Sequence, residues 1–108
     1  MKKAIILMLA LAGSAHAEFV DGNGLLNQLR DTGSYFKQGH SMGYIAGVAD
    51  MGYGVVHCAP SNLTQGQLND MIKNYLENTP AERHLTGDVI VNKVLKTMWP
   101  CAKRGGAL

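Results

Sequence analysis

Cys58 and Cys101 have the clearest chemical potential in this 108-residue sequence, because they are its only cysteines. In an oxidising compartment, an even pair of cysteines most simply forms a disulfide. The competing interpretations are a catalytic thiol beside His57 and a metal site. No CxxC or HExxH motif supports either of them, and the histidines are scattered along the chain. We therefore predict an intrachain disulfide between Cys58 and Cys101.

His40, Ser41 and Asp50 supply the residue types of a nucleophilic triad. Neighbouring residues on a helix do not face each other, however, so Ser41 and His40 lack the geometry that a nucleophile and its base require. The sequence also has no phosphate-binding glycine loop. We therefore predict no catalytic residues, no cofactor and no metal.

Asp50, Arg83 and His84 are the polar residues that are hardest to place on a solvated surface. One interpretation is a structural polar cluster, in which an ion pair ties the helix that carries Asp50 to the turn that carries Arg83 and His84. The other interpretation places the three residues on a surface that contacts a partner. Both interpretations stay open.

Residues 1–17 have the layout of a cleaved secretory signal peptide, with two lysines, an apolar stretch and an Ala-His-Ala exit. We expect cleavage between Ala17 and Glu18. The apolar stretch has about half of the roughly 20 residues that a membrane span needs, so no membrane anchor is predicted. This layout indicates export through the Sec pathway into a Gram-negative periplasm.

The mature chain is expected to carry no net charge. Two of the ten Lys and Arg residues leave with the signal peptide, and eight remain beside eight Asp and Glu residues. Nucleic acids and anionic membranes need clustered basic residues, so neither is predicted as a partner. Residues 18–108 suffice for a single domain, which we expect to end in a frayed tail at 102–108.

The elements that must position these residues are predicted to be helices. Asp21 can cap a first helix that ends near Gly33. Ser34 can cap a second helix, which runs from Tyr35 to about Met51. The fold class predicted from these and two later helices is all-α, a compact domain of four to five helices with one intrachain disulfide.

Thr64 begins the string TQGQ, which has the spacing of a capping box, and apolar residues then recur at helical spacing until Pro80. Thr86 can cap a fourth helix that Pro100 ends, although the β-branched run at 89–91 could also form a strand. The buried side of this helix is expected to carry five apolar residues: Ile90, Val91, Val94, Leu95 and Met98.

Gly39, Gly43 and Gly47 recur every four residues along the second predicted helix. Glycine costs roughly 0.8 to 1 kcal/mol in a helix interior, so three on one stripe need a reason. A stripe without side chains allows another backbone to approach closely. We predict close packing against another helix, either of the same chain or of a second copy.

Six short segments follow one another in this order: GYIAGVAD at 43–50, CAP at 58–60, LTQGQL at 63–68, YL at 75–76, RH at 83–84 and WPC at 99–101. As an ordered set they resemble the Rap/Tai family, and the resemblance covers the chain from about Asp21 to Cys101. These are periplasmic immunity proteins of type VI secretion, which protect a cell from peptidoglycan amidase effectors.

The resemblance implies an all-α fold, often a homodimer, that occludes an effector's active site and performs no chemistry itself. The implied partners are therefore a cell-wall amidase effector and a second copy of the chain. Many members carry a second cysteine pair, where this sequence has Leu29 and Ser41. The alternative function is that of a phage- or prophage-encoded exported protein on the same scaffold, acting in superinfection exclusion or lysis control.

Overall fold

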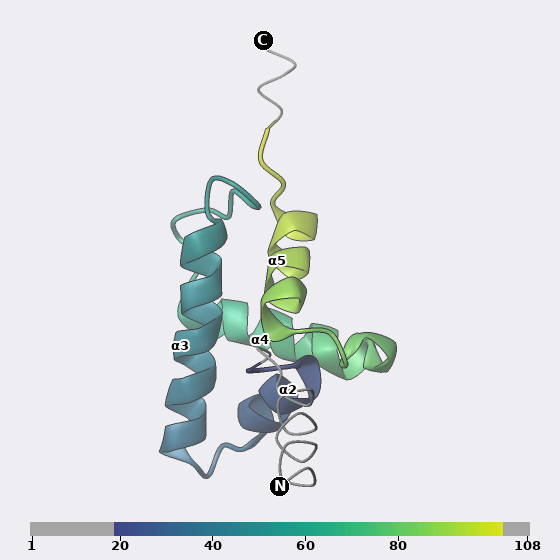
Figure 1. Ribbon diagram of the computed structural model, residues 1–108. Coiled ribbons are helices and arrows are strands. Elements are labelled where there is room, and N and C mark those ends of the chain that lie inside the picture. The colour runs from purple at the N-terminus through teal and green to yellow at the C-terminus, as the bar shows by residue number, and fades with distance from the viewer. Residues whose placement is uncertain (1–18, 103–108) are drawn as a thin grey trace, which may run out of the picture.

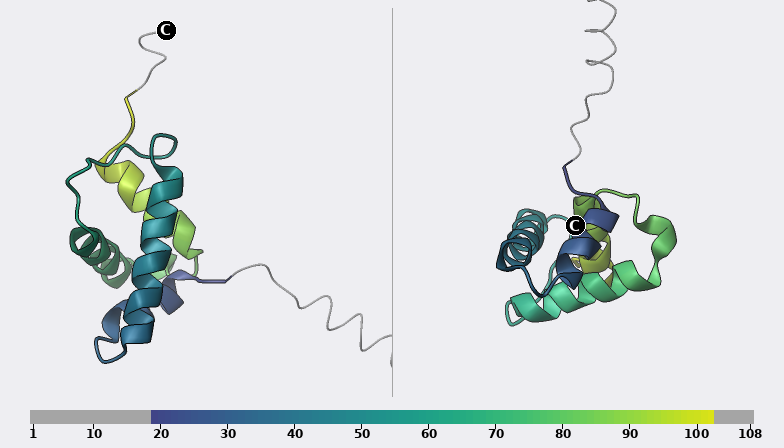
Figure 2. Two further views of the ribbon diagram at one scale, coloured as in Figure 1. Left: turned by 90° about the vertical axis from the view of Figure 1, so that its left-hand side faces the viewer. Right: turned by 90° about the horizontal axis from the view of Figure 1, so that it is seen from below.

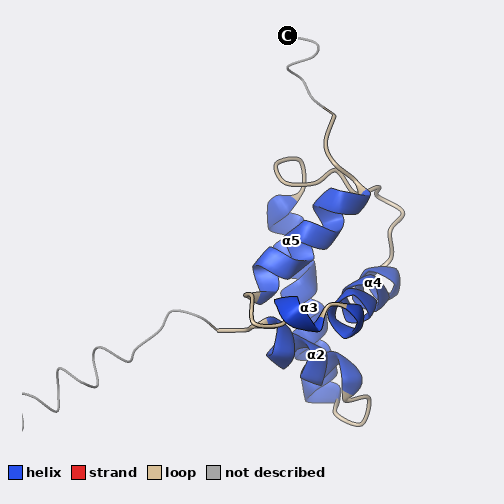
Figure 3. Ribbon diagram, turned by 90° about the vertical axis from the view of Figure 1, so that its right-hand side faces the viewer, coloured by secondary structure: helices blue, strands red, loops and turns tan. Residues whose placement is uncertain are grey.

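The structure, a computed structural model, describes residues 19–102 and is helical throughout its regular elements (Figure 1). In chain order these are α2 (Gly22–Arg30), α3 (Tyr35–Gly52), α4 (Gln65–Asn78), the 3₁₀ turn η1 (Pro80–Glu82) and α5 (Gly87–Met98). Figure 3 shows helices and loops only over this range, which confirms the predicted all-α class. The predicted signal peptide and residues 103–108 of the predicted tail lie outside the described residues.

Side-chain caps begin three of the helices where the sequence predicts them. The Asp21 carboxylate accepts a hydrogen bond from the Gly24 N–H (2.8 Å), and the Ser34 hydroxyl accepts one from the Lys37 N–H (3.2 Å). The capping box of α4 is complete. Each cap satisfies a backbone N–H that the first helical turn leaves without a partner, so these side chains fix where the helices begin.

α2 ends at Arg30, earlier than the predicted end near Gly33. The Asp31 N–H donates to the Gln28 carbonyl (3.3 Å), and the Asp31 side chain accepts from the Gly33 N–H (3.2 Å). An aspartate that bonds to the backbone two residues ahead forms a turn of its own, and this turn competes with helix continuation.

α5 begins through backbone pairing rather than through its predicted side-chain cap. Thr86 occupies the N-cap position without a side-chain hydrogen bond. Instead, the segment before α2 pairs antiparallel with it: the Gly87 N–H donates to the Val20 carbonyl (2.8 Å) and the Gly22 N–H donates to the Leu85 carbonyl (2.9 Å). The β-branched run that could have formed a strand lies inside α5.

α3 and α5 lie side by side and run in the same general direction, while α4 crosses them (Figure 1). α2 packs against α3 and α4, as the further views show (Figure 2). The core between the helices consists of Leu25, Leu26, Leu29, Ile45, Leu68, Ile72, Leu76, Ile90, Val91, Val94 and Leu95. Ile45 is its only fully buried hydrophobic residue from the 18-residue α3. The prediction that Met98 is buried is wrong, because its side chain is 56% exposed at the end of α5.

A disulfide joins Cys58 to Cys101, as predicted, with 4.8 Å between their Cα atoms. It connects the turn after α3 to the segment after α5. The Cys58 N–H also donates to the Trp99 carbonyl (2.8 Å), so a backbone hydrogen bond accompanies the covalent link. Together they hold the ends of α3 and α5 at one end of the molecule.

Removal of this disulfide is expected to be costly. The cysteines are 43 residues apart in the sequence, and chain-entropy reasoning for a loop of this length gives at most about 4 kcal/mol. We expect the Cys58→Ser/Cys101→Ser protein to lose a large part of that amount in urea unfolding. Intact-mass analysis after alkylation should find no free thiol in the unreduced wild type. Equal unfolding free energies, or two alkylatable thiols in the wild type, would contradict the prediction.

Glu82 links α4, η1 and α5. Its carboxylate accepts hydrogen bonds from the Lys93 ammonium (2.6 Å) and the Tyr75 hydroxyl (2.7 Å). Both partners stabilise the ionised form, Lys93 more strongly, and they hold the pKa of the Glu82 carboxyl below its ordinary value. The same contact raises the pKa of Lys93.

A lowered pKa in the folded state means that Glu82 contributes stability above the pKa of the unfolded chain and loses this contribution as the pH falls through the folded pKa. We expect Glu82→Gln to unfold at lower urea than the wild type at pH 7, with the difference closing in acid. Asp70→Asn, on the exposed side of α4, provides a control that should lack this pattern. A difference between wild type and Glu82→Gln that stayed constant with pH would argue against the ionic link.

Candidate functional site: a partner-binding surface

One side of α3 and the turn after it exposes apolar side chains to solvent. Tyr35 is 94% exposed, Phe36 81%, Met51 84% and Val55 83%. Met42 and Tyr53 are exposed as well, but Met42 is nine residues from Met51 and so lies about 180° from it around the helix. We call the exposed side of α3 that runs from Phe36 to Met51 the α3 face. Exposed aromatic and aliphatic side chains that gather on one element mark a candidate surface for binding other molecules. The α3 face is therefore the candidate functional site.

The predicted glycine stripe lies on this face. A Cβ built on Gly39, Gly43 or Gly47 meets no other group within 4 Å. The prediction that these glycines pack against another helix of the same chain is therefore wrong. Ile45 is two residues from Gly43 and Gly47, about 200° around the helix, so burying Ile45 turns the stripe toward solvent. Packing of the stripe against a second copy stays a prediction.

Other glycines of the domain do make close contacts. A Cβ on Gly22 would lie 2.7 Å from the Arg83 carbonyl oxygen, and one on Gly87 would lie 2.7 Å from the Tyr44 ring. Because Gly22 and Gly87 lack side chains, the start of α2 can pack closely against the Arg83 backbone and the start of α5 against Tyr44. No regular spacing in the sequence marks them, because the contacts join segments that are far apart in the chain.

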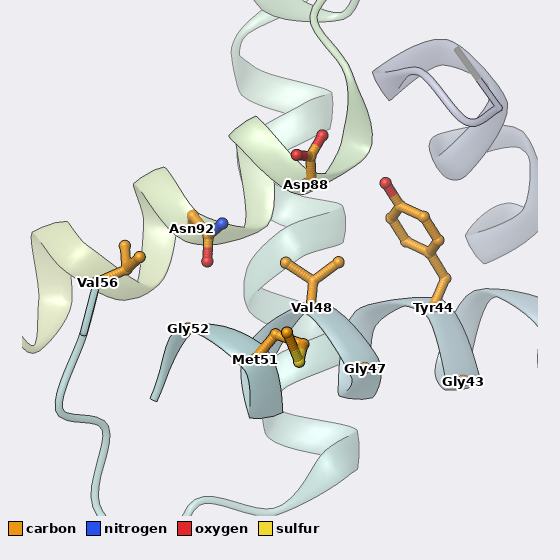
Figure 4. A pocket seen from close by; sticks show the side chains of 9 residues that line it. All are labelled: Gly43, Tyr44, Gly47, Val48, Met51, Gly52, Val56, Asp88 and Asn92. Atoms are coloured by element: carbon orange, nitrogen blue, oxygen red, sulfur yellow. The ribbon is translucent and has the colours of Figure 1, made fainter. Parts of the chain in front are cut away.

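A groove of about 540 Å³ runs between α3 and α5, beside the glycine stripe (Figure 4). We call it the α3–α5 groove. Its lining residues are Gly43, Tyr44, Gly47, Val48, Met51, Gly52, Val56, Asp88 and Asn92. Met51 and Val48 form the middle of the groove, and Tyr44 lies toward Asp88 at one end. A mostly apolar groove of this kind accepts side chains of a partner protein.

Two polar groups in this groove have constrained states. Burial raises the pKa of the Tyr44 hydroxyl, and the nearby Asp88 carboxylate raises it further, so the hydroxyl stays protonated at neutral pH. The Asn92 side-chain oxygen is buried and has no hydrogen-bond partner among residues 19–102. An unsatisfied buried oxygen costs about 1 to 3 kcal/mol, and this one faces Gly52, where a Cβ would lie 2.8 Å from it.

His57 is buried against the C-terminal end of α3. Its ring is 2% exposed, Nε2 lies 2.9 Å from the Ala49 carbonyl oxygen, and Nδ1 lies 3.2 Å from the Ala59 backbone nitrogen. The Ala59 N–H donates to Nδ1, and Nε2 donates to the Ala49 carbonyl, so each ring nitrogen has a backbone partner. His57 therefore fixes the turn after α3 to the helix. Its partners are backbone atoms, so spacing in the sequence gives no sign of this role.

His40 and Ser41 do not form a catalytic pair. The His40 ring nitrogen Nδ1 lies 2.8 Å from the Gln28 side-chain oxygen, and the Ser41 hydroxyl donates to the Gln38 carbonyl (3.0 Å). Ser41 is buried, as is Leu29, so both positions at which the resemblance to Rap/Tai proteins implies a second cysteine pair lie in the interior here.

The structure does not bring Asp50, Arg83 and His84 into one cluster. Arg83 donates instead to two carbonyls at the end of α4, those of Leu76 (2.7 Å) and Glu77 (3.1 Å). Asp50 is exposed on α3, and no ion pair joins it to Arg83 within the described range. The predicted structural ion pair is therefore wrong. Arginine at a helix C-terminus satisfies carbonyls that have no partner in the last turn, which explains its position.

Residues 19–102 contain no group of three or more His, Cys, Asp or Glu side chains arranged to hold a metal ion. In the same range, no helix combines the length and the apolar character that crossing a bilayer requires.

The described residues form a small all-α domain with one disulfide and exposed apolar side chains on one long helix. The sequence model of the family described as Rap1a immunity proteins matches residues 21–101. The chain therefore belongs to this family, which confirms the resemblance to Rap/Tai proteins, and its class is that of immunity proteins against a secreted effector. The family implies a role as an inhibitor that binds a protein effector. A search of curated proteins found no significant match.

The glycine contacts lead to opposite expectations for two substitutions. Gly39→Ala should stabilise the chain by up to about 1 kcal/mol, because it adds helix propensity and meets nothing within 4 Å. Gly22→Ala should destabilise it by about 1 to 3 kcal/mol, because its Cβ would lie 2.7 Å from a backbone oxygen. Urea unfolding of both proteins measures the two effects. A loss of stability in Gly39→Ala would show that Gly39 is packed in solution.

Proposed function

We propose that this protein is a periplasmic immunity protein that binds a peptidoglycan amidase effector of type VI secretion and occludes its active site. Membership of the immunity family supports the inhibitory role. The signal-peptide layout of residues 1–17 supports export. The Cys58–Cys101 disulfide is in keeping with an oxidising compartment such as the periplasm, where amidase effectors reach the cell wall.

The observation that carries the proposal is the exposed α3 face. α3 has 18 residues, which corresponds to a ridge about 27 Å long. Phe36 and Met51 stand at opposite ends of this ridge and are both more than 80% exposed. Aromatic residues and methionine are enriched at the centres of protein interfaces. A helical ridge of this length, with apolar side chains at both ends and glycines between them, suits insertion into an extended substrate cleft, which is how a binding protein excludes a polymeric substrate.

The proposal includes a homodimer. Gly43 and Gly47 line the α3–α5 groove and have no side chains, so a helix of a second copy can approach α3 closely at these positions. Met51 lines the same groove, so in this proposal the two copies separate before the effector binds the α3 face. The mass of the mature wild type, measured by light scattering after gel filtration, should be that of a dimer. Gly43→Leu should shift it toward the monomer, and Gly39→Ala, outside the groove, should not. A monomeric wild type would remove the homodimer from the proposal and leave the inhibitory function intact.

The test of function is a titration of a purified cell-wall amidase effector with the mature protein. Inhibition should be complete near one binding site per enzyme, because occlusion is stoichiometric. Met51→Ala should weaken binding about tenfold or more, as expected for an interface anchor.

Met98→Ala is the matched control, since Met98 is also an exposed methionine but lies at the end of α5. It should bind like the wild type. If Met98→Ala weakened binding and Met51→Ala did not, the α3 face would not be the binding surface. Absence of inhibition by the wild type at any ratio would refute the amidase assignment.

A further inference from the structure

A second groove lies on the other side of α3 from the α3–α5 groove, between α3 and the segment that leads into α4. It has a volume of about 250 Å³. The small apolar side chains of Ala46, Ala49 and Ala59 form part of its wall, and Leu63 and Leu68 also line it. Asp50 and Tyr53 line it from the end of α3 and the turn that follows. We call this the Asp50 groove.

The Asp50 carboxylate brings negative charge to this groove, and no ion pair to Asp50 forms within residues 19–102. None of the lining residues is Lys or Arg. Arg30, Lys37 and Lys93 form ion pairs with other carboxylates, and the Arg83 guanidinium bonds to carbonyls at the end of α4. An exposed carboxylate in a groove with apolar walls favours a cationic side chain whose methylene groups can pack against those walls.

The groove is also held open by the fold. The rings of Tyr53 and His57 meet edge to face, with 6.1 Å between their centroids, and the two residues form a backbone bridge. His57 is fixed in turn by its hydrogen bonds to Ala49 and Ala59, which line the same groove. A ligand that enters the Asp50 groove therefore meets walls that need no rearrangement, which lowers the cost of binding.

We infer that the Asp50 groove binds an arginine side chain of the effector protein, an inference that rests on the function proposed above. The methylene stem of arginine lies well along small apolar walls. Its planar guanidinium matches a carboxylate through two hydrogen bonds and stacks on aromatic rings, which Asp50 and Tyr53 supply. Asp50 is thus a specificity-determining residue, next to the apolar anchors of the α3 face.

The groove can be tested without an effector. The probe is N-acetyl-arginine methylamide, titrated to tens of millimolar into the full mature chain and followed through backbone amide shifts by NMR. Shifts should saturate at residues that line the groove, Asp50 and Gln65 among them. The citrulline analogue, which has nearly the same shape but no charge, should bind at least several-fold more weakly. Equal shifts with both probes, or no saturable shift in the groove, would overturn the inference.

Three variants identify the group responsible. Asp50→Asn should abolish the saturable shifts, whereas Asp70→Asn, which removes an exposed carboxylate from α4, should retain them. Lys103→Gln/Arg104→Gln should leave the probe affinity unchanged. If that double variant instead bound the probe much more tightly, the basic residues of this chain's own tail would be the occupant, and the inference would be wrong.

In the complex with the amidase effector, Asp50→Asn should raise the Kd about tenfold or more and reduce its dependence on salt, whereas Asp70→Asn should do neither. An effect no larger than that of Asp70→Asn would count against the groove. The two proposals fail separately: a wild type that inhibits normally with an unaffected Asp50→Asn variant overturns only the arginine site. A wild type that inhibits no amidase overturns the proposed function, and the probe titration still decides whether the groove selects arginine.

Discussion

The attachment of the end of α3 to the end of α5 is the constraint on which the rest of the domain depends. α3 contributes one fully buried hydrophobic residue to the core, and Tyr44, Val48 and Ala49 pack against that core at partial burial. Three glycines on its exposed side lower its helix propensity, so α3 depends on these contacts and on the attachment of its ends. Its C-terminal end is held by His57, which bonds to the Ala49 carbonyl, and by the disulfide that begins at the next residue. These contacts allow a long helix to stay in place while most of one side remains uncovered.

The exposed α3 face lowers the stability of the folded monomer. Three solvent-facing glycines cost roughly 2 to 3 kcal/mol relative to alanine, and the exposed aromatic residues at the start of α3 gain nothing from burial in the monomer. A domain of this size has about 5 to 15 kcal/mol of total stability, so the loss is considerable. Residues that lower stability are expected where they serve binding rather than the fold. Here the glycines and the exposed aromatic residues lie on the α3 face.

Much of the fold could be predicted from the sequence because its signals are local. Asp21, Ser34 and Thr64 cap helices by accepting hydrogen bonds from N–H groups within three residues of themselves. With only two cysteines in the chain, only one intrachain disulfide is possible. The surface was harder to predict. Spacing shows that Gly43 and Gly47 share one side of α3, but the direction in which that side points depends on how α2, α4 and α5 pack. The structural roles of Arg83 and His57 could not be predicted for a related reason. Both side chains bond to backbone carbonyls, which every residue type offers equally.

Two grooves flank the α3 ridge, and their chemistry differs. The α3–α5 groove is glycine-rich and contains Tyr44, whose hydroxyl remains uncharged, so it favours close packing of apolar surfaces. The Asp50 groove has the smaller volume and offers a carboxylate beside an aromatic ring. Apolar contacts supply affinity to many partners, whereas a charge in a shaped groove discriminates among them. α3 forms a wall of both grooves. The helix that contributes the fewest fully buried hydrophobic residues to the core is therefore the one that offers both apolar contacts and a charged contact to a partner.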